Sequence, residues 1–200
     1  MGEAIDRGRR QLLTAATTLT GAVGVAFAAV PFLASWKPSA RAKALGAPVE
    51  IDISKLEPGA MLKIEWRGKP VWVVRRTPEM IERLAAGEAL LADPQSENSK
   101  QPEYAQNDAR AVNAEYFVVL GVCTHLGCAP MSRFEPGDAE LTTGNTAWPG
   151  GFYCPCHGSK FDLSGRVFRG VPAPTNLEVP PYTFADSGHI VIGVDQAKDA

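Results

Sequence analysis

The chain has 200 residues, of which 45% are hydrophobic, and a formal net charge of −2. This length fits one domain with appendages, and the hydrophobic content is ordinary for a globular protein. Residues 49–200 hold 14 Lys and Arg against 20 Asp and Glu, a balance of −6. Because the sequence contains no basic stripe, it argues against nucleic-acid binding.

The N-terminal part of the chain is typical of a membrane anchor. Residues 1–10 are polar, and the run from Gln11 to Trp36 holds no charged residue. These 26 positions exceed the roughly 20 residues that a helix needs to cross a bilayer. We therefore expect a polar N-terminus over residues 1–11 and a single transmembrane helix over residues 12–36.

Two features bear on the fate and orientation of this helix. A cleaved signal peptide is the alternative to an anchor, but the apolar run is longer than the roughly 7–15 residues of a signal peptide's apolar region. Three Lys or Arg precede the run and three follow it shortly, so the positive-inside rule does not orient it. The stretch from Arg9 to Leu13 resembles a twin-arginine export signal. We therefore expect an uncleaved anchor in a bacterial inner membrane, with residues 1–11 in the cytoplasm and the following domain in the periplasm.

The segment after the apolar run is a predicted linker. Residues 37–48 contain two prolines, one glycine and several small residues, and they show no strand pattern. Residues 40–45 could form one or two helical turns. We expect a flexible hinge here, with an inert tether as the alternative.

From residue 49 onward, strand patterns dominate. Apolar and polar residues alternate over Val49 to Ile53 and, in part, over Met61 to Trp66. Residues 67–69 predict a hairpin turn before a further strand over Pro70 to Arg75. Other predicted strands are Tyr116 to Val122, Gly151 to Tyr153, a hairpin over Phe161 to Phe168, and His189 to Val194.

One short helix interrupts these strands. Thr77 is a typical N-cap residue, Pro78 suits the first helical position, and Gly87 suits the end of the helix. A polar loop over residues 88–112 follows, and a loop of this length is usually functional or an insertion. Residues 49–200 thus predict one all-β antiparallel domain.

Two short motifs hold all four cysteines and two of the three histidines. The first is Cys-Thr-His-Leu-Gly-Cys over residues 123–128, and the second is Cys-Pro-Cys-His-Gly-Ser over residues 154–159. Each motif offers a Cys and a His, and each carries a further cysteine, Cys128 or Cys156. Two Cys and two His split between two loops match a [2Fe–2S] centre in which His replaces Cys on one iron.

Two other chemistries use the same residue types. A tetrahedral Cys2His2 zinc site is one, but it leaves the two further cysteines unexplained. A pair of disulfides in an exported domain is the other, but it leaves both histidines and the repeated motif unexplained.

The two motifs, separated by 25 residues, resemble those of the Rieske iron–sulfur proteins, and more narrowly of the Rieske subunits of bacterial cytochrome bc1 complexes. The resemblance covers nearly the whole chain. It implies a Rieske-type antiparallel β-sandwich head with a cluster-binding subdomain, carried on a single N-terminal transmembrane helix. Residues 49–200 would form the periplasmic [2Fe–2S] domain.

The resemblance also implies how the cluster is held. Cys123 and Cys154 would bind one iron as thiolates, and His125 and His157 would bind the outer iron. His157 would also meet the quinol hydroxyl, although spacing alone cannot choose between the two histidines.

Other residues receive supporting roles from the resemblance. Cys128 and Cys156 would form a disulfide between the two loops, and the Ser159 hydroxyl would bond a bridging sulfide. Leu126 would lie at the tip of the docking surface. His189 stands outside both motifs and is more typical of a structural or exposed position than of a ligand.

Two positions depart from the family pattern. Residues 170–174 are similar to its cluster-covering proline loop, but Val171 is interposed in the usual Gly-Pro-Ala-Pro sequence. Phe161 stands where the family often has a tyrosine, and a phenylalanine cannot donate a hydrogen bond.

The implied function is electron transfer in a respiratory quinol–cytochrome c reductase. The subunit would take one electron, coupled to proton release, from ubiquinol at cytochrome b and pass it to cytochrome c1. Expected partners are these two subunits, ubiquinol and membrane lipid. The alternative is the small Rieske subunit of a periplasmic arsenite oxidase, which a molybdenum-containing partner would reveal.

Overall fold

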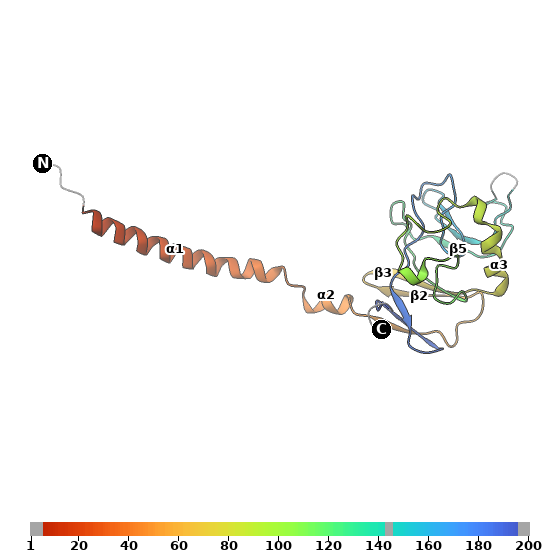
Figure 1. Cartoon of the computed structure of the whole chain (residues 1–200), viewed down its shortest axis with the longest axis horizontal. Helices are drawn as coiled ribbons and strands as arrows, with labels where there is room; N and C mark the ends of the chain where they lie inside the picture. The colour runs from red at the N-terminus through yellow and green to blue at the C-terminus, as the bar shows by residue number, and fades with distance from the viewer. Residues whose placement is uncertain (1–5, 143–145, 196–200) are drawn as a thin grey trace. The chain divides into compact units, whose positions relative to one another are not determined.

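The computed structural model describes residues 6–142 and 146–195, and it separates into two compact units, residues 1–44 and 45–200 (Figure 1). The first unit is dominated by helix α1 (Arg7–Ser35), which Asp6 caps by accepting hydrogen bonds from the backbone N–H groups of Gly8 and Arg9. The helix is long and apolar enough to cross a membrane. These properties fit the predicted single-pass anchor, with the regular helix ending one residue before Trp36.

The predicted linker contains a short helix, α2 (Ala40–Leu45). The C-terminal end of the predicted linker, after α2, is hydrogen-bonded to the head: the indole N–H of Trp66 donates to the carbonyl of Ala47 at 3.1 Å. The regular part of the head begins directly afterwards, at Val49.

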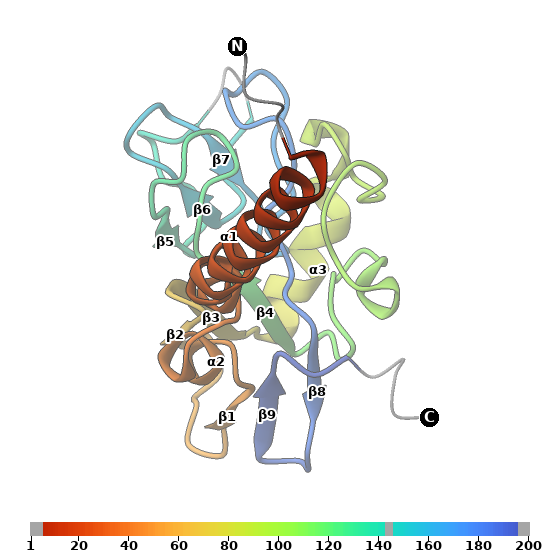
Figure 2. The ribbon, with the colours of Figure 1, turned by 90° about the vertical axis from the view of Figure 1, so that its left-hand side faces the viewer.

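The head is built from three antiparallel three-stranded sheets, which confirms the predicted all-β class (Figure 2). Figure 2 shows the first sheet at one end of the head and the third sheet at the other. In sheet order the strands are β1 (Val49–Asp52), β9 (His189–Ile192) and β8 (Tyr182–Phe184); β2 (Met61–Trp66), β3 (Lys69–Arg75) and β4 (Tyr116–Leu120); and β5 (Met131–Arg133), β6 (Gly151–Tyr153) and β7 (Lys160–Phe161).

Local sequence signals explain several of these elements. Arg67 and Gly68 both have positive φ, at 52° and 71°, which allows a two-residue turn between β2 and β3. Helix α3 (Pro78–Ala86) begins as predicted, with the Thr77 hydroxyl accepting from the N–H of Met80 at 3.3 Å. The region of residues 88–112 contains two short 3-10 helices, η1 (Glu88–Leu90) and η2 (Glu103–Ala105).

The core joins the second sheet to the third and thereby positions the site. Trp72 of β3 stacks on Phe152 of β6, with ring centroids 5.4 Å apart. The indole also covers Gly121, where an added Cβ would come 2.2 Å from the ring. Only glycine fits there, so close packing fixes the chain as it leaves β4 for the first cysteine motif.

Candidate metal centre

The two cysteine motifs form loops with one shared hydrogen-bond pattern. In each loop the first residue donates its N–H to the carbonyl of the sixth, from Cys123 to Cys128 and from Cys154 to Ser159, both at 2.8 Å. The fifth residue is a glycine with φ near +80° (83° at Gly127 and 78° at residue 158), and it donates back to the first residue. An added Cβ would meet no atom within 4 Å, so backbone conformation, not space, favours glycine here.

This shared pattern shows which positions of the two loops correspond. Cys123 and Cys154 occupy the same first position, but His125 is third in its loop and His157 is fourth in the other. Sequence reasoning missed this correspondence, although the Gly-Cys and Gly-Ser endings of the two motifs are a visible signal of it.

The two cysteines at the first position are free thiols. Cys123 is 3% exposed and Cys154 is 1% exposed. Burial raises the pKa of the Cys123 thiol, and the neighbouring Cys154 thiol raises it further. A bound cation would offset this cost of holding thiolates in an apolar setting.

The side chains of the two motif histidines, His125 and His157, contact each other. Their rings lie edge to face with centroids 4.8 Å apart. The Nδ1 atom of His125 is buried and has no hydrogen-bond partner among the described residues, whereas His157 is exposed. An unpartnered buried nitrogen is unusual. Together with the two thiols, it fits a bound metal cluster whose second histidine faces outward.

The other two cysteines join the loops covalently. Cys128 and Cys156 form a disulfide, the pairing that the family resemblance implies. Their sulfurs lie within 4.8 Å of that of Cys154, but as a disulfide they are not thiolate ligands.

The proline-containing segment 170–174 is bonded to the second loop, and the residue that follows the segment is bonded to the first. The Ser159 hydroxyl accepts from the N–H of Ala173 at 3.1 Å, and the Thr124 hydroxyl donates to the carbonyl of Thr175 at 2.7 Å. The interposed Val171 is half-buried and packs against the core. Leu126 is 71% exposed at the first loop.

The remaining singled-out residues lie outside this centre. His189 is partly exposed on β9, and its Nδ1 atom lies 2.9 Å from a carboxylate oxygen of Asp186. Phe161 is fully buried in the hydrophobic core. The contact of His189 with Asp186 fits the structural or exposed position that was expected for this histidine.

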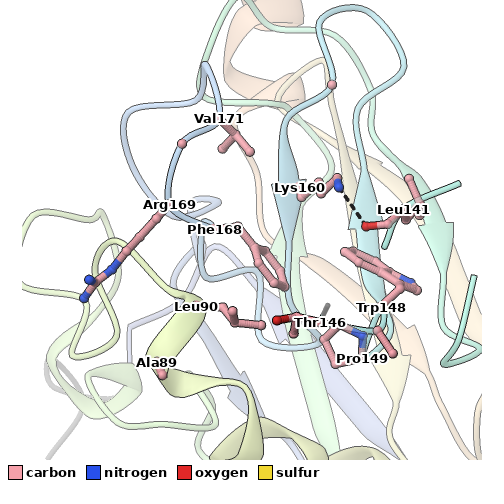
Figure 3. A pocket seen from close by; sticks show the side chains of 13 residues that line it. Ala89, Leu90, Leu141, Thr146, Trp148, Pro149, Lys160, Phe168, Arg169 and Val171 are labelled. Atoms are coloured by element: carbon pink, nitrogen blue, oxygen red, sulfur yellow. Dashed lines mark hydrogen bonds between the residues drawn. The ribbon is translucent and has the colours of Figure 1, made fainter. Parts of the chain in front are cut away.

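A cavity of about 400 Å³ borders the second loop (Figure 3). Figure 3 shows Trp148, Phe168 and Leu90 lining it, with Val171 at its edge. None of the four candidate ligands lines this cavity. It is therefore separate from the proposed cluster position.

Replacing Cys128 by serine is expected to shorten the lifetime of a bound cluster. The disulfide closes a separation of 28 residues, for which the chain-entropy model assigns about 3.5 kcal/mol. The measurement is the half-life of the cluster's visible absorption in the presence of an iron chelator. Cys156→Ser should behave alike, and the double variant should be no worse than either, because all three lose one bond. An unchanged half-life would contradict this role.

Comparison with known proteins agrees with the site. The family model described as Rieske [2Fe-2S] domain matches residues 48–182. A second model, described as Ubiquitinol-cytochrome C reductase Fe-S subunit TAT signal, matches residues 3–39. The head is thus a Rieske domain, and its cofactor is a [2Fe–2S] cluster, not zinc.

Sequence identity to known proteins shows to which group of Rieske proteins the chain belongs. The chain is 54% identical to the ubiquinol–cytochrome c reductase iron–sulfur subunit of Allochromatium vinosum, over 98% of this chain and 93% of the relative. It is 43% identical to the subunit of that name from Blastochloris viridis, over 94% of each chain. Among solved structures, a chain of a hyperthermophilic respiratory Complex III matches 90% of this chain and 98% of its own, with 25% identity and a TM-score of 0.47. The chain belongs to the Rieske iron–sulfur subunits of ubiquinol–cytochrome c reductase.

Proposed function

We propose that this subunit takes one electron from ubiquinol at cytochrome b and passes it to cytochrome c1. Cys123 and Cys154 would hold one iron of the cluster, and His125 and His157 would hold the other. The assignment rests on two buried thiols that contact each other, on the backbone hydrogen bond from His125 to the Cys123 sulfur, and on the contact between the His125 and His157 rings. When bound, a Rieske cluster accepts and releases one electron, at a potential that its neutral histidine ligands raise.

The different exposure of the two histidines supports separate roles. His157 is exposed, so a quinol could reach the imidazole nitrogen that does not hold iron. Once that nitrogen has lost its own proton, it can accept a hydrogen bond from the quinol hydroxyl and then take up the proton. His125 is less exposed, and its buried Nδ1 is suited to holding iron. The exposed Leu126 beside them would pack against the partner subunit.

The surrounding residues would hold this arrangement. Ser159 is fully buried; its hydroxyl accepts from Ala173 and hydrogen-bonds the Cys123 thiol, so its proton would be available to sulfur in the cluster site. The disulfide would keep both loops together, and residues 173 and 175 would each hold one of them. Such hydrogen bonds to sulfur raise the potential further.

The rest of the chain would place the head. Residues 1–11 would lie in the cytoplasm, residues 12–36 would cross the inner membrane, and residues 37–48 would act as the hinge. Residues 49–200 would then lie in the periplasm with ubiquinol and membrane lipid nearby. The match to a TAT-signal family model over residues 3–39 supports export of a folded head.

An arsenite oxidase subunit is not favoured, because the relatives above carry the name of the quinol enzyme. Metal and haem analysis of the full chain, purified from detergent-solubilised membranes, tests the assignment. We expect two iron atoms and two acid-labile sulfides per chain, an EPR signal only after reduction, and b- and c-type haem in the same complex. Molybdenum without these haems, or zinc without iron, would overturn the assignment.

A further inference from the structure

Beyond the cluster loops, the head encloses an unusual set of charged side chains. The buried charged residues of the described chain are three arginines and two aspartates: Arg76, Arg110, Arg166, Asp93 and Asp162. Their formal charges leave an excess of one positive charge. Charged groups are rarely fully buried, so this excess calls for a physical role.

One of the arginines is neutralised locally. The Nε atom of Arg166 lies 2.7 Å from a carboxylate oxygen of Asp162, and both side chains are buried. With that pair set aside, the charges that remain are those of Arg76, Arg110 and Asp93. Asp162 also acts on both of these arginines, and Asp93 acts on Arg110.

Arg110 belongs to the region of residues 88–112 and is 0% exposed. It donates to the carbonyls of Ser164 and Gly165 at 3.2 and 3.4 Å and to the side-chain oxygen of Gln101 at 3.0 Å. Its Nε has no partner in the described part of the chain. None of its bonded partners is an anion, so its charge is not cancelled at the point of contact.

Arg76, which directly follows β3, is also hydrogen-bonded to Ser164. It donates to the Ser164 hydroxyl at 2.7 Å and to the backbone carbonyls of Ala109 and Ala114 at 3.0 and 2.8 Å. Burial lowers the pKa of Arg76 and of Arg110 to about 10, which still leaves both groups protonated at neutral pH.

A shared hydrogen-bond partner, Ser164, links both cations to the chain just after the second cluster loop. Ser164 is five residues after Ser159, which limits the distance between their Cα atoms to about 18 Å. Between buried groups, charges interact over such distances, because the effective dielectric constant is below that of water and salt screens buried charges much less than exposed ones. An iron–sulfur cluster gains a negative charge on reduction, and its potential depends on the surrounding charge.

We propose that Arg110, supported by Arg76, raises the reduction potential of the cluster through its buried positive charge, and that Asp93 opposes it. The proposal rests on the proposed function, because it requires a cluster between the two loops. It gives the region of residues 88–112 an electrostatic role in addition to its packing.

Two substitutions of opposite sign test the proposal against a merely structural role. Arg110→Gln removes a positive charge and keeps a hydrogen-bonding side chain, so the potential should fall. Asp93→Asn removes a negative charge at nearly constant shape, so the potential should rise. Arg110→Lys keeps the charge while changing the shape, and it serves as the matched control with a smaller shift than Arg110→Gln.

The readout is the midpoint potential of the full chain in detergent, measured by voltammetry at one pH, with the EPR spectrum as the check of an intact cluster. Opposite shifts for Arg110→Gln and Asp93→Asn support the proposal. Shifts in the same direction, equal shifts for Arg110→Gln and Arg110→Lys, or no shift in any variant would overturn it. If wild type shows no cluster signal, the proposed function itself fails, which is a separate outcome. If Arg110→Gln does not fold, the comparison of Asp93→Asn with wild type decides, and a fall or no change overturns the proposal.

Discussion

Replacing His157 by alanine is expected to abolish the EPR signal of the reduced cluster and the iron content of the purified chain. The imidazole would supply one of only two nitrogen ligands to the outer iron, and alanine offers no replacement. Because His157 is exposed, its removal leaves no cavity in the core, and the head should keep its fold. EPR, iron analysis and circular dichroism on one preparation measure the three consequences.

His189→Ala is the matched control. His189 is the third histidine of the chain; it begins β9 in the first sheet and contacts Asp186 in the turn before this strand. Its replacement should leave the EPR signal and the iron content unchanged. A His157 variant that retains the wild-type signal, or a His189 variant that loses it, would contradict the proposed ligand set.

Short-range patterns in the sequence were sufficient to predict much of the fold. The alternation in β1 and β2 depends only on neighbouring residues, and the structure confirms it. The Thr77 cap of α3 is confirmed for the same reason. The hairpin turn predicted over residues 67–69 is also present, but it is one residue shorter, because β3 begins at Lys69. Such signals act within a few residues, so they survive without knowledge of the tertiary contacts.

The parts that the sequence did not reveal depend on contacts between distant residues. The region 88–112 has no periodic pattern, because it is held by polar contacts such as those of Arg110 with Ser164 and Gly165. A buried arginine looks like a surface arginine in a sequence. The different exposure of His125 and His157 likewise depends on how two separate loops meet.

The motifs themselves were more informative than any pattern. Cysteine and histidine are uncommon residues, so their concentration in two short motifs predicts a bound metal centre. The choice between zinc and iron–sulfur came from the family, and the geometry adds the burial of Cys123 and Cys154. The residue types were thus sufficient to predict a metal centre, whereas the burial of each ligand residue could be found only from the folded structure.

Replacing Arg166 by methionine is expected to destabilise the head by about 3 to 5 kcal/mol, the usual cost of leaving one member of a buried ion pair alone. The Arg166 and Asp162 side chains are only 1% and 7% exposed, so water cannot take the place of the lost guanidinium. Arg166 also donates to the carbonyl of Leu84 at 2.9 Å, at the end of α3. Chemical denaturation of the head, followed by circular dichroism, measures the loss.

The double variant Arg166→Met with Asp162→Asn separates the unpaired charge from the lost packing. The introduced amide would carry no charge, and its oxygen could still accept from the N–H groups of residues 164 and 166, which Asp162 bonds at 2.9 and 2.7 Å. The double variant should therefore recover part of the stability, because the buried carboxylate is gone. If it is as unstable as Arg166→Met alone, the cost lies in the contacts to α3 and in packing. In that case the hairpin after the second cluster loop is held by shape, and charge pairing contributes little to it.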